Sequence, residues 1–193
     1  MEKGRLEAFS DGVIAVIITI MVLELHPPHE ASLAALQELV HPFFAYVLSF
    51  IYTGIYWNNH HHLFQTVERV DGRVLWANNA LLFTLSLVPF ATSWMGETDF
   101  ALWPTVVYGV VLFLPGAAYG ILTGALIKLH GPDSPLSRAV GAGYKEWLSL
   151  ILYALGIGGA FINPYIGFAF YLSVAAMWLI PDRRIERQIS GEH

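Results

Sequence analysis

The sequence predicts an all-α integral membrane protein without a soluble domain, in which residues 1–193 form a single domain that crosses the bilayer six times. Composition is the first indication, because 55% of the residues are hydrophobic and only 13% are charged, about half the charged share of a typical soluble domain. Spacing is the second, since a helix needs about 20 largely apolar residues to cross the hydrocarbon core. Suitable segments lie near residues 9–25, 42–66, 75–95, 101–127, 146–162 and 164–181.

The basic residues predict how these helices are oriented. If the N-terminus is cytoplasmic, all ten Lys and Arg residues fall in cytoplasmic segments, and the only formal charges of the outer loops are acidic. The basic residues are Lys3, Arg5, Arg69, Arg73, Lys128, Arg138, Lys145, Arg183, Arg184 and Arg187. Lys and Arg in short loops favour the cytoplasmic side. We therefore expect a multi-pass protein of the cell membrane with both termini cytoplasmic. A signal peptide is not expected, because Glu2, Glu7 and Asp11 interrupt the basic start.

Several classes of function are disfavoured by the residues present. The chain has no cysteine, so disulfides and thiolate metal sites are excluded, and its net charge of -5 provides no basic patch for nucleic acid. The run His60, His61 and His62 does not suit a metal, because adjacent helical residues point about 100° apart and helical ligand pairs need a spacing of three or four. Catalytic triads, phosphate-binding glycine loops and nucleotide motifs are missing from the sequence. We expect neither a cofactor nor an enzyme.

Polar residues within apolar segments are costly in a membrane and therefore informative. They gather at the expected cytoplasmic ends of the first three segments: Ser10 and Asp11, then Trp57, Asn58, Asn59, His60, His61 and His62, then Trp76, Asn78 and Asn79. Buried polar groups in a low dielectric must satisfy one another. We therefore expect a hydrogen-bonded network that holds the first helix against the next two. The expected partners of Asp11 are Arg5, Asn78, Asn79, Trp76 and the histidines of the second segment.

The first segment also has an apolar stripe. At about 100° per residue, one face of a helix carries Arg5, Phe9, Gly12, Val16, Ile20 and Leu23, with Thr19 on its flank. Asp11 points roughly 140° away from Val16. The polar residues and the stripe therefore face different partners. The residues alone leave open whether lipid, core packing or another surface meets the stripe.

Several stretches resemble the bacterial members of the transmembrane protein 175 potassium channel family. They are GRLEAFSDGVIAVIITIMVLEL, IYWNNHH, VDGRVLWANNALLF and LVPFAT. The resemblance covers nearly the whole chain, and its specific part is the RxxxFSDG pattern made by Arg5, Phe9, Ser10, Asp11 and Gly12. It implies a six-helix subunit. Larger relatives contain two such repeats and dimerise, whereas single-repeat members form tetramers around a central pore. The resemblance therefore implies a homotetramer in membrane lipid, with potassium as the permeant ion.

The resemblance also implies which residues line the pore. The first helix would line it, with Val16, Ile20 and Leu23 at the constriction and the hydroxyl of Thr19 between them. The sequence contains no TVGYG-like carbonyl filter, so selectivity is expected at the apolar constriction, which gates by dewetting. Glu24 follows just outside, where four carboxylates at the pore mouth would attract cations.

Three alternatives remain beside a potassium channel. A secondary transporter is disfavoured because such proteins usually place polar residues at the bilayer midplane on broken helices, whereas the polar residues here lie near the cytoplasmic side. Proton conduction is a second alternative, since lysosomal members of the family are also reported to pass protons. No titratable residue lies between Asp11 and Glu24 on the stripe. A membrane scaffold that conducts nothing is the third, and ion flux distinguishes it from a channel.

Overall fold

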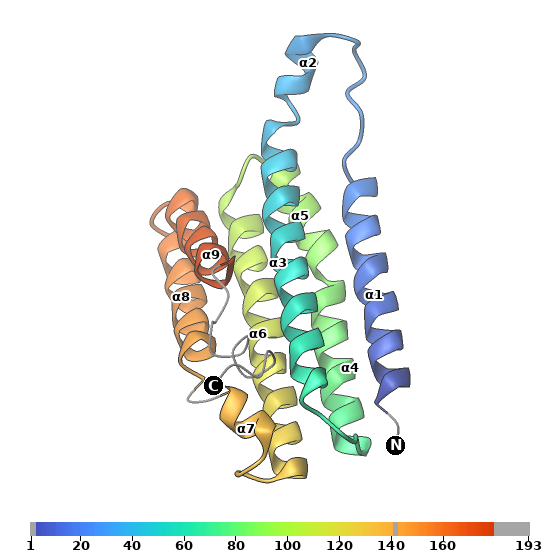
Figure 1. Cartoon of the computed structure of the whole chain (residues 1–193). Helices are drawn as coiled ribbons and strands as arrows, with labels where there is room; N and C mark the ends of the chain where they lie inside the picture. Colours follow the sequence, from blue (N-terminus) through green and yellow to red (C-terminus); the bar gives the residue numbers. More distant parts are fainter. Residues whose placement is uncertain (1–2, 141–142, 180–193) are drawn as a thin grey trace.

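The computed structural model describes residues 3–140 and 143–179, and Figure 1 shows their helices packed side by side in an elongated bundle. Among these residues there is no β-strand. The predicted cytoplasmic residues Arg183, Arg184 and Arg187 lie outside the described part of the chain. The described helices are α1 (Gly4–Leu23), α2 (Leu33–Gln37), α3 (Val40–Gln65), α4 (Gly72–Ser86), α5 (Val88–Glu97), α6 (Leu102–His130), α7 (Pro135–Val140), α8 (Tyr144–Ala160) and α9 (Pro164–Leu179).

The long helices follow the six predicted segments, with one break. The third segment forms two helices, because Leu87 ends α4 and begins α5. Pro89 accounts for the break, since proline has no N–H to bond the carbonyl four residues earlier. Three described stretches are long and apolar enough to span a membrane, namely Gly4–Leu23, Gly72–Glu97 and Leu102–His130. The all-α class is confirmed, whereas the expected count of six crossings is not established by this criterion.

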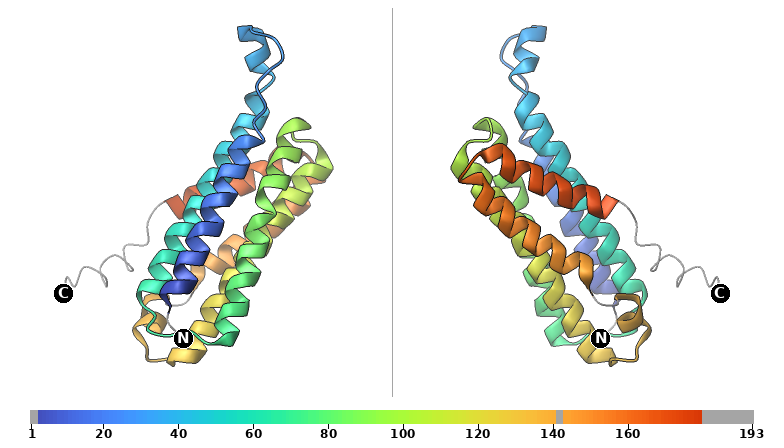
Figure 2. Two further views of the ribbon diagram at one scale, coloured as in Figure 1. Left: turned by 90° about the vertical axis from the view of Figure 1, so that its right-hand side faces the viewer. Right: turned by 90° about the vertical axis from the view of Figure 1, so that its left-hand side faces the viewer.

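The helices form two groups that meet along α6. Helix α3 packs on α1 and α5, and α4 packs on α6, while α8 and α9 form a hairpin against the other side of α6. Figure 2 shows α9 crossing the bundle at a steep angle. The short helix α2 projects beyond the other helices at the end opposite the N-terminus. We call this the outer end. Ser32 caps α2 by accepting a hydrogen bond from the backbone N–H of Ala35 at 3.2 Å.

Buried hydroxyl groups join the helices inside the bundle. The Ser49 hydroxyl on α3 lies 2.6 Å from the Thr92 hydroxyl on α5 and 2.8 Å from the Tyr108 hydroxyl on α6. Tyr52 on α3 donates a hydrogen bond to the carbonyl of Tyr171 on α9. A buried hydroxyl without a partner is costly, so these bonds restrict how the helices can slide or rotate against one another.

A glycine lets the outer end of α5 lie against the start of α3. Gly96 is buried, and a Cβ atom there would stand 2.7 Å from Cα of Pro42 and 3.4 Å from Cβ of Ala45. The nearer neighbour is backbone, so a side-chain rotation cannot relieve the contact. This position therefore requires glycine. The close approach also brings the start of α3 next to the turn that follows α5.

Gly96→Ala is expected to lower the free energy of unfolding by about 1–3 kcal/mol, the range for overpacking a tight site, because the added methyl group must push α3 and α5 apart. Gly124→Ala is the matched control. A Cβ at Gly124 meets no atom within 4 Å, and alanine is a better helix former than glycine. Thermal unfolding of detergent-solubilised protein compares the two variants, and equal midpoints contradict the close approach.

Candidate pore-lining face of the first helix

Helix α1 is packed on one face and uncovered on another. Its buried residues recur every three or four positions and are Leu6, Ser10, Ile14, Ile17 and Met21. The uncovered face carries large apolar side chains, among which Phe9 is 58% exposed, Val16 55%, Ile20 42% and Leu23 74%. Three of these are the residues expected at a constriction. Within one subunit the described helices therefore leave the apolar stripe of α1 open.

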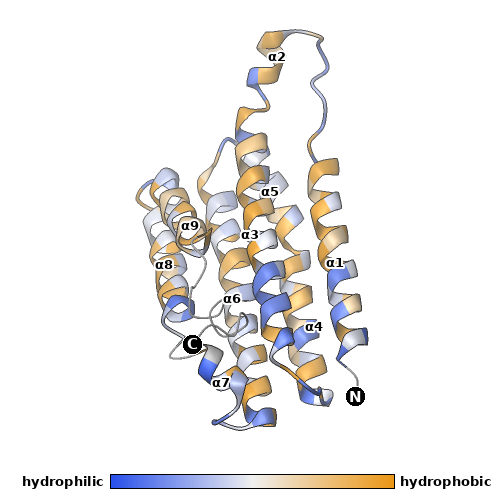
Figure 3. Ribbon diagram, in the orientation of Figure 1, coloured by the Kyte–Doolittle hydropathy of each residue, from blue (hydrophilic) through white to orange (hydrophobic). Residues whose placement is uncertain are grey.

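A buried chain of hydrogen bonds anchors the other face of α1 near its start. The side-chain N–H of Asn78 donates to Ser10 Oγ at 2.9 Å, and the Ser10 hydroxyl donates to the carbonyl of Leu6 at 2.8 Å. Asn78 Oδ1 lies 2.8 Å from His60 Nε2. Ser10, His60 and Asn78 are 0%, 2% and 1% exposed, and Figure 3 shows hydrophilic segments on α1, α3 and α4. The three helices are thus joined by satisfied polar groups.

Asp11 has a partner that the sequence did not suggest. Its Oδ1 accepts a hydrogen bond from Trp57 Nε1 at 2.9 Å, and both residues are exposed. Successive residues on a helix differ in direction by about 100°, so Ser10 takes the buried position and Asp11 lies at the edge of α1 beside α3. The expectation that Asp11 bonds to Arg5, Asn78, Asn79, Trp76 or a histidine is therefore wrong.

The remaining polar residues do not form one network. His61 stacks on Trp57, with 5.9 Å between ring centroids, and its Nε2 lies 2.9 Å from the side-chain nitrogen of Gln65. The side chains of Asn58, Trp76 and Asn79 are exposed and make no hydrogen bond within the described ranges. His60 belongs to the buried chain of hydrogen bonds, whereas the rings of His61 and His62 pack on each other, with 5.8 Å between their centroids. The described residues contain no group of three or more His, Asp or Glu side chains that could hold a metal ion.

Thr19 lies on the open side of α1 and directs its hydrogen inward. Its Oγ1 stands 2.9 Å from the carbonyl oxygens of both Ala15 and Val16. The single hydroxyl hydrogen is therefore donated to the helix backbone. A hydroxyl in this state offers only lone pairs to its surroundings, which suits a cation better than an anion.

A groove with a volume of about 1050 Å³ runs beside the open face, between α1 and α5. Its walls include Phe9, Val16 and Ile20 of α1 and Phe90, Ser93 and Trp94 of α5. At the outer end, Ser93 Oγ lies 3.0 Å from Oε1 of Glu97 and 3.4 Å from Oε2 of Glu24. Sequence reasoning singled out Glu24 and missed these two companions. Their spacing of four residues, which places Ser93 and Glu97 on one helix face, was the available signal.

The sequence of this chain is similar to those of known proteins. The family model described as endosomal/lysosomal potassium channel TMEM175 matches residues 5–89. A potassium channel from Chryseobacterium sp. (strain P1-3) is 55% identical over 189 residues, which cover 98% of each chain. The chain belongs to the TMEM175 family. A potassium channel from Streptomyces collinus is also similar to this chain, at 33% identity over 175 residues and 84% of each chain.

A solved TMEM175 structure has the same fold. The crystal structure of a lysosomal potassium-selective channel TMEM175 homologue from Chamaesiphon minutus matches with a TM-score of 0.81 at 26% identity, covering 94% of this chain and 97% of that one. The family resemblance predicted from the sequence is confirmed, and the family is one of ion channels rather than enzymes. The endosomal/lysosomal proton channel TMEM175 of Gallus gallus is 29% identical over 132 residues, which cover 25% of its length.

Asn78→Leu is expected to lower the free energy of unfolding by about 1–3 kcal/mol, because it leaves Nε2 of the buried His60 without its partner and removes the bond between α4 and Ser10 Oγ. Asn79→Leu is the matched control, since Asn79 is the exposed neighbour and surface changes usually stay within about 0.5 kcal/mol. The measurement is thermal unfolding in detergent. A loss at Asn79 as large as that at Asn78 argues against an anchor at Ser10.

Proposed function

We propose that four copies of this chain form a potassium channel of the cell membrane, with α1 of each copy lining a central pore. One observation carries the proposal: Val16, Ile20 and Leu23 are exposed on a helix whose other face is held by buried hydrogen bonds. An exposed apolar stripe on a helix that is fixed in orientation is typical of a surface that contacts another subunit or a ligand. The relatives from Chryseobacterium and Streptomyces, which this chain matches over most of their length, are described as potassium channels.

The proposed topology has six crossings and cytoplasmic termini. Helices α1, α3, α6, α8 and α9 each cross once, and α4 with α5 crosses as one kinked span. The start of α1, the loop between α3 and α4, and α7 lie at the same end of the bundle. Basic residues in or next to these segments are Lys3, Arg5, Arg69, Arg73 and Arg138. Such a concentration of basic residues at one end supports a cytoplasmic position for it.

Several copies are needed because one subunit encloses no path along the open face of α1. In a ring, one surface of each copy contacts a different surface of the next copy. The ring closes when the rotation between neighbouring copies adds up to a full turn. The groove between α1 and α5 then faces the neighbouring copy, which covers apolar walls that are otherwise open. The single FSDG pattern in the chain supports four such copies by the family resemblance.

The chemistry of the stripe favours a weakly hydrated cation. Rings of Val16, Ile20 and Leu23 offer water no hydrogen bond, so the neck conducts only when it is wide enough to remain wet. Potassium sheds its water more easily than sodium and therefore passes such a neck at lower cost. The lone pairs of Thr19 face the same path, and Glu24 with Glu97 gives the outer mouth a negative potential that concentrates cations.

Proton conduction is the second candidate, because the relative from Gallus gallus is described as a proton channel. Along α1, the titratable residues nearest the constriction in the sequence are Asp11 on one side and Glu24 on the other, and none lies between them. A proton therefore needs an unbroken column of water through the same apolar neck. Potassium is the preferred ion because it requires no side-chain relay.

Ion flux from liposomes that contain purified protein tests the proposal. Potassium-loaded vesicles are expected to release potassium faster than sodium-loaded vesicles release sodium, while a pH-sensitive dye inside reports protons. The mass of the detergent-solubilised particle is expected to correspond to four chains. Equal potassium and sodium rates contradict the selectivity, proton flux without potassium flux supports the second candidate, and no flux of any ion contradicts a channel.

Ile20→Asn is expected to raise the single-channel potassium conductance and to bring sodium and potassium permeabilities closer together, because an amide ring hydrates the neck. Ile18→Asn is the matched control. Ile18 packs against the core, so its change is expected to reduce the yield of folded protein and to leave the conductance of each remaining channel unchanged. Single-channel recording distinguishes the two outcomes. The same conductance in both variants would mean that α1 does not line the path.

A further inference from the structure

The outer turn between α5 and α6 contains two consecutive strained residues. Asp99 and Phe100 have φ angles of 50° and 55°. Positive φ is moderately common for aspartate, whereas it is a genuine outlier for a bulky side chain such as phenylalanine. Strained backbone persists only where surrounding contacts over-determine it, and it often marks a switching element. The contacts that hold this turn are therefore of interest.

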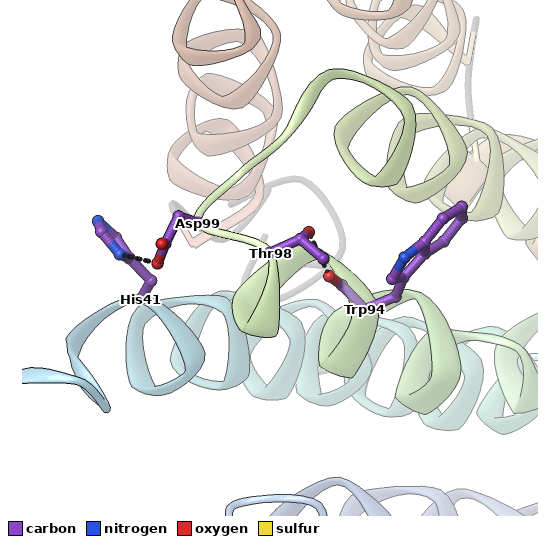
Figure 4. Close-up of polar contacts among 4 residues, drawn as sticks. All are labelled: His41, Trp94, Thr98 and Asp99. Carbon is purple, nitrogen blue, oxygen red and sulfur yellow. Dashed lines mark hydrogen bonds and ion pairs between the residues drawn. The ribbon is translucent and has the colours of Figure 1, made fainter.

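Packing holds the second strained residue. Phe100 is 5% exposed, and its ring centroid lies 4.8 Å from that of Phe168 and 6.2 Å from that of Tyr165, both on α9. The backbone N–H of Phe100 donates to the carbonyl of Met95 at 3.1 Å. Within the turn, the Thr98 hydroxyl donates to the carbonyl of Trp94 at 2.6 Å (Figure 4). The turn is thus fixed to α9 and to the end of α5.

One histidine contacts both strained residues from the start of α3. His41 Nδ1 lies 2.7 Å from Oδ1 of Asp99 (Figure 4), and the His41 ring meets the Phe100 ring edge-on at 5.2 Å. The side chains of His41 and Asp99 are 40% and 77% exposed, so protons from the solution reach them freely. The close approach of Gly96 to Pro42 places α3 and α5 so that this contact can form.

The charges around His41 determine the sign of a pH effect. The carboxylate of Asp99 is the charged group bonded to His41, which is the second residue of α3. The other titratable groups on the neighbouring segments are Glu38 before α3, Glu97 at the end of α5 and Tyr165 on α9, and none of these is bonded to His41 among the described residues. Imidazole normally changes its charge between about pH 5 and 8. A charged hydrogen bond is roughly twice as strong as a neutral one.

We propose that His41 and Asp99 form a proton-operated clamp, which holds the outer end of α5 against α3 in acid and loosens as the pH rises. The protonated imidazole makes a charge-assisted bond to the carboxylate, and loss of the proton leaves only a neutral donor against a strained turn. Helix α5 also carries Ser93, whose hydroxyl lies within hydrogen-bond distance of both Glu97 on α5 and Glu24 after α1. Resting on the proposed function and its orientation, the clamp makes the external pore mouth responsive to external pH.

Hydrogen exchange of the turn, measured by mass spectrometry on the peptide spanning residues 97–103 of the full-length protein, tests the clamp. Exchange is compared between about pH 5.5 and 8 and corrected with an unstructured peptide of the same sequence. In the wild type we expect protection to fall by about two- to fivefold over this range, the scale of an exposed ion pair. The measurement does not depend on ion conduction. If exchange of the turn shows the expected pH dependence but the liposomes show no potassium flux, the result contradicts the proposed function and leaves the clamp standing.

Two variants remove the clamp by different routes. His41→Gln keeps a hydrogen-bond donor that cannot be protonated, and Asp99→Asn removes the carboxylate while asparagine tolerates positive φ. Both are expected to exchange at the same corrected rate at the two pH values. His29→Gln is the control, since His29 is exposed in the outer loop, and it is expected to keep the wild-type pH dependence. A wild-type turn without pH dependence, or a dependence that survives in both variants, overturns the proposal.

Discussion

The rotational position of α1 is the constraint on which the rest of the site depends. Ser10, Asn78 and His60 are buried and bonded to one another, and breaking either bond leaves a polar group unsatisfied in a low dielectric. Helix α1 therefore cannot turn freely about its axis. Because each residue of a helix is rotated by a fixed angle from the one before it, the anchor near one end also determines which side chains of α1 are uncovered further along the helix. Val16, Ile20 and Leu23 are open for this reason.

The opposite wall of the groove is positioned by different contacts. Gly96 allows α5 to touch the backbone of Pro42, and Ser49 joins α3 to α5 through Thr92. Helix α5 thus presents Ser93 and Glu97 beside Glu24 at the outer end of α1. One polar anchor near the start of α1 and one close backbone contact at the outer end together define the shape of the apolar groove between them.

Much of this arrangement could be predicted from the sequence, because length, apolar periodicity and polar clustering leave direct traces. The long helices and the open stripe of α1 follow from such patterns. The partner of Asp11 could not be predicted, since a helical wheel places Ser10 and Asp11 in one polar patch without showing which of them is buried. The break before Pro89 interrupts a segment that reads as one apolar run. The strained turn could not be predicted, because Asp99 and Phe100 adopt positive φ without a glycine at either position and are held by tertiary contacts.

The chain has no cysteine, so a single introduced thiol reports one position without a competing reaction. The most direct test of a pore along α1 is the effect of a positively charged methanethiosulfonate reagent on potassium currents through Leu23→Cys and Met21→Cys channels. Leu23 is 74% exposed on the open face and Met21 is 2% exposed on the anchored face. Our account predicts rapid modification and reduced current at position 23, with no change at position 21. Modification at position 21 alone, or no change of current at position 23, would contradict it.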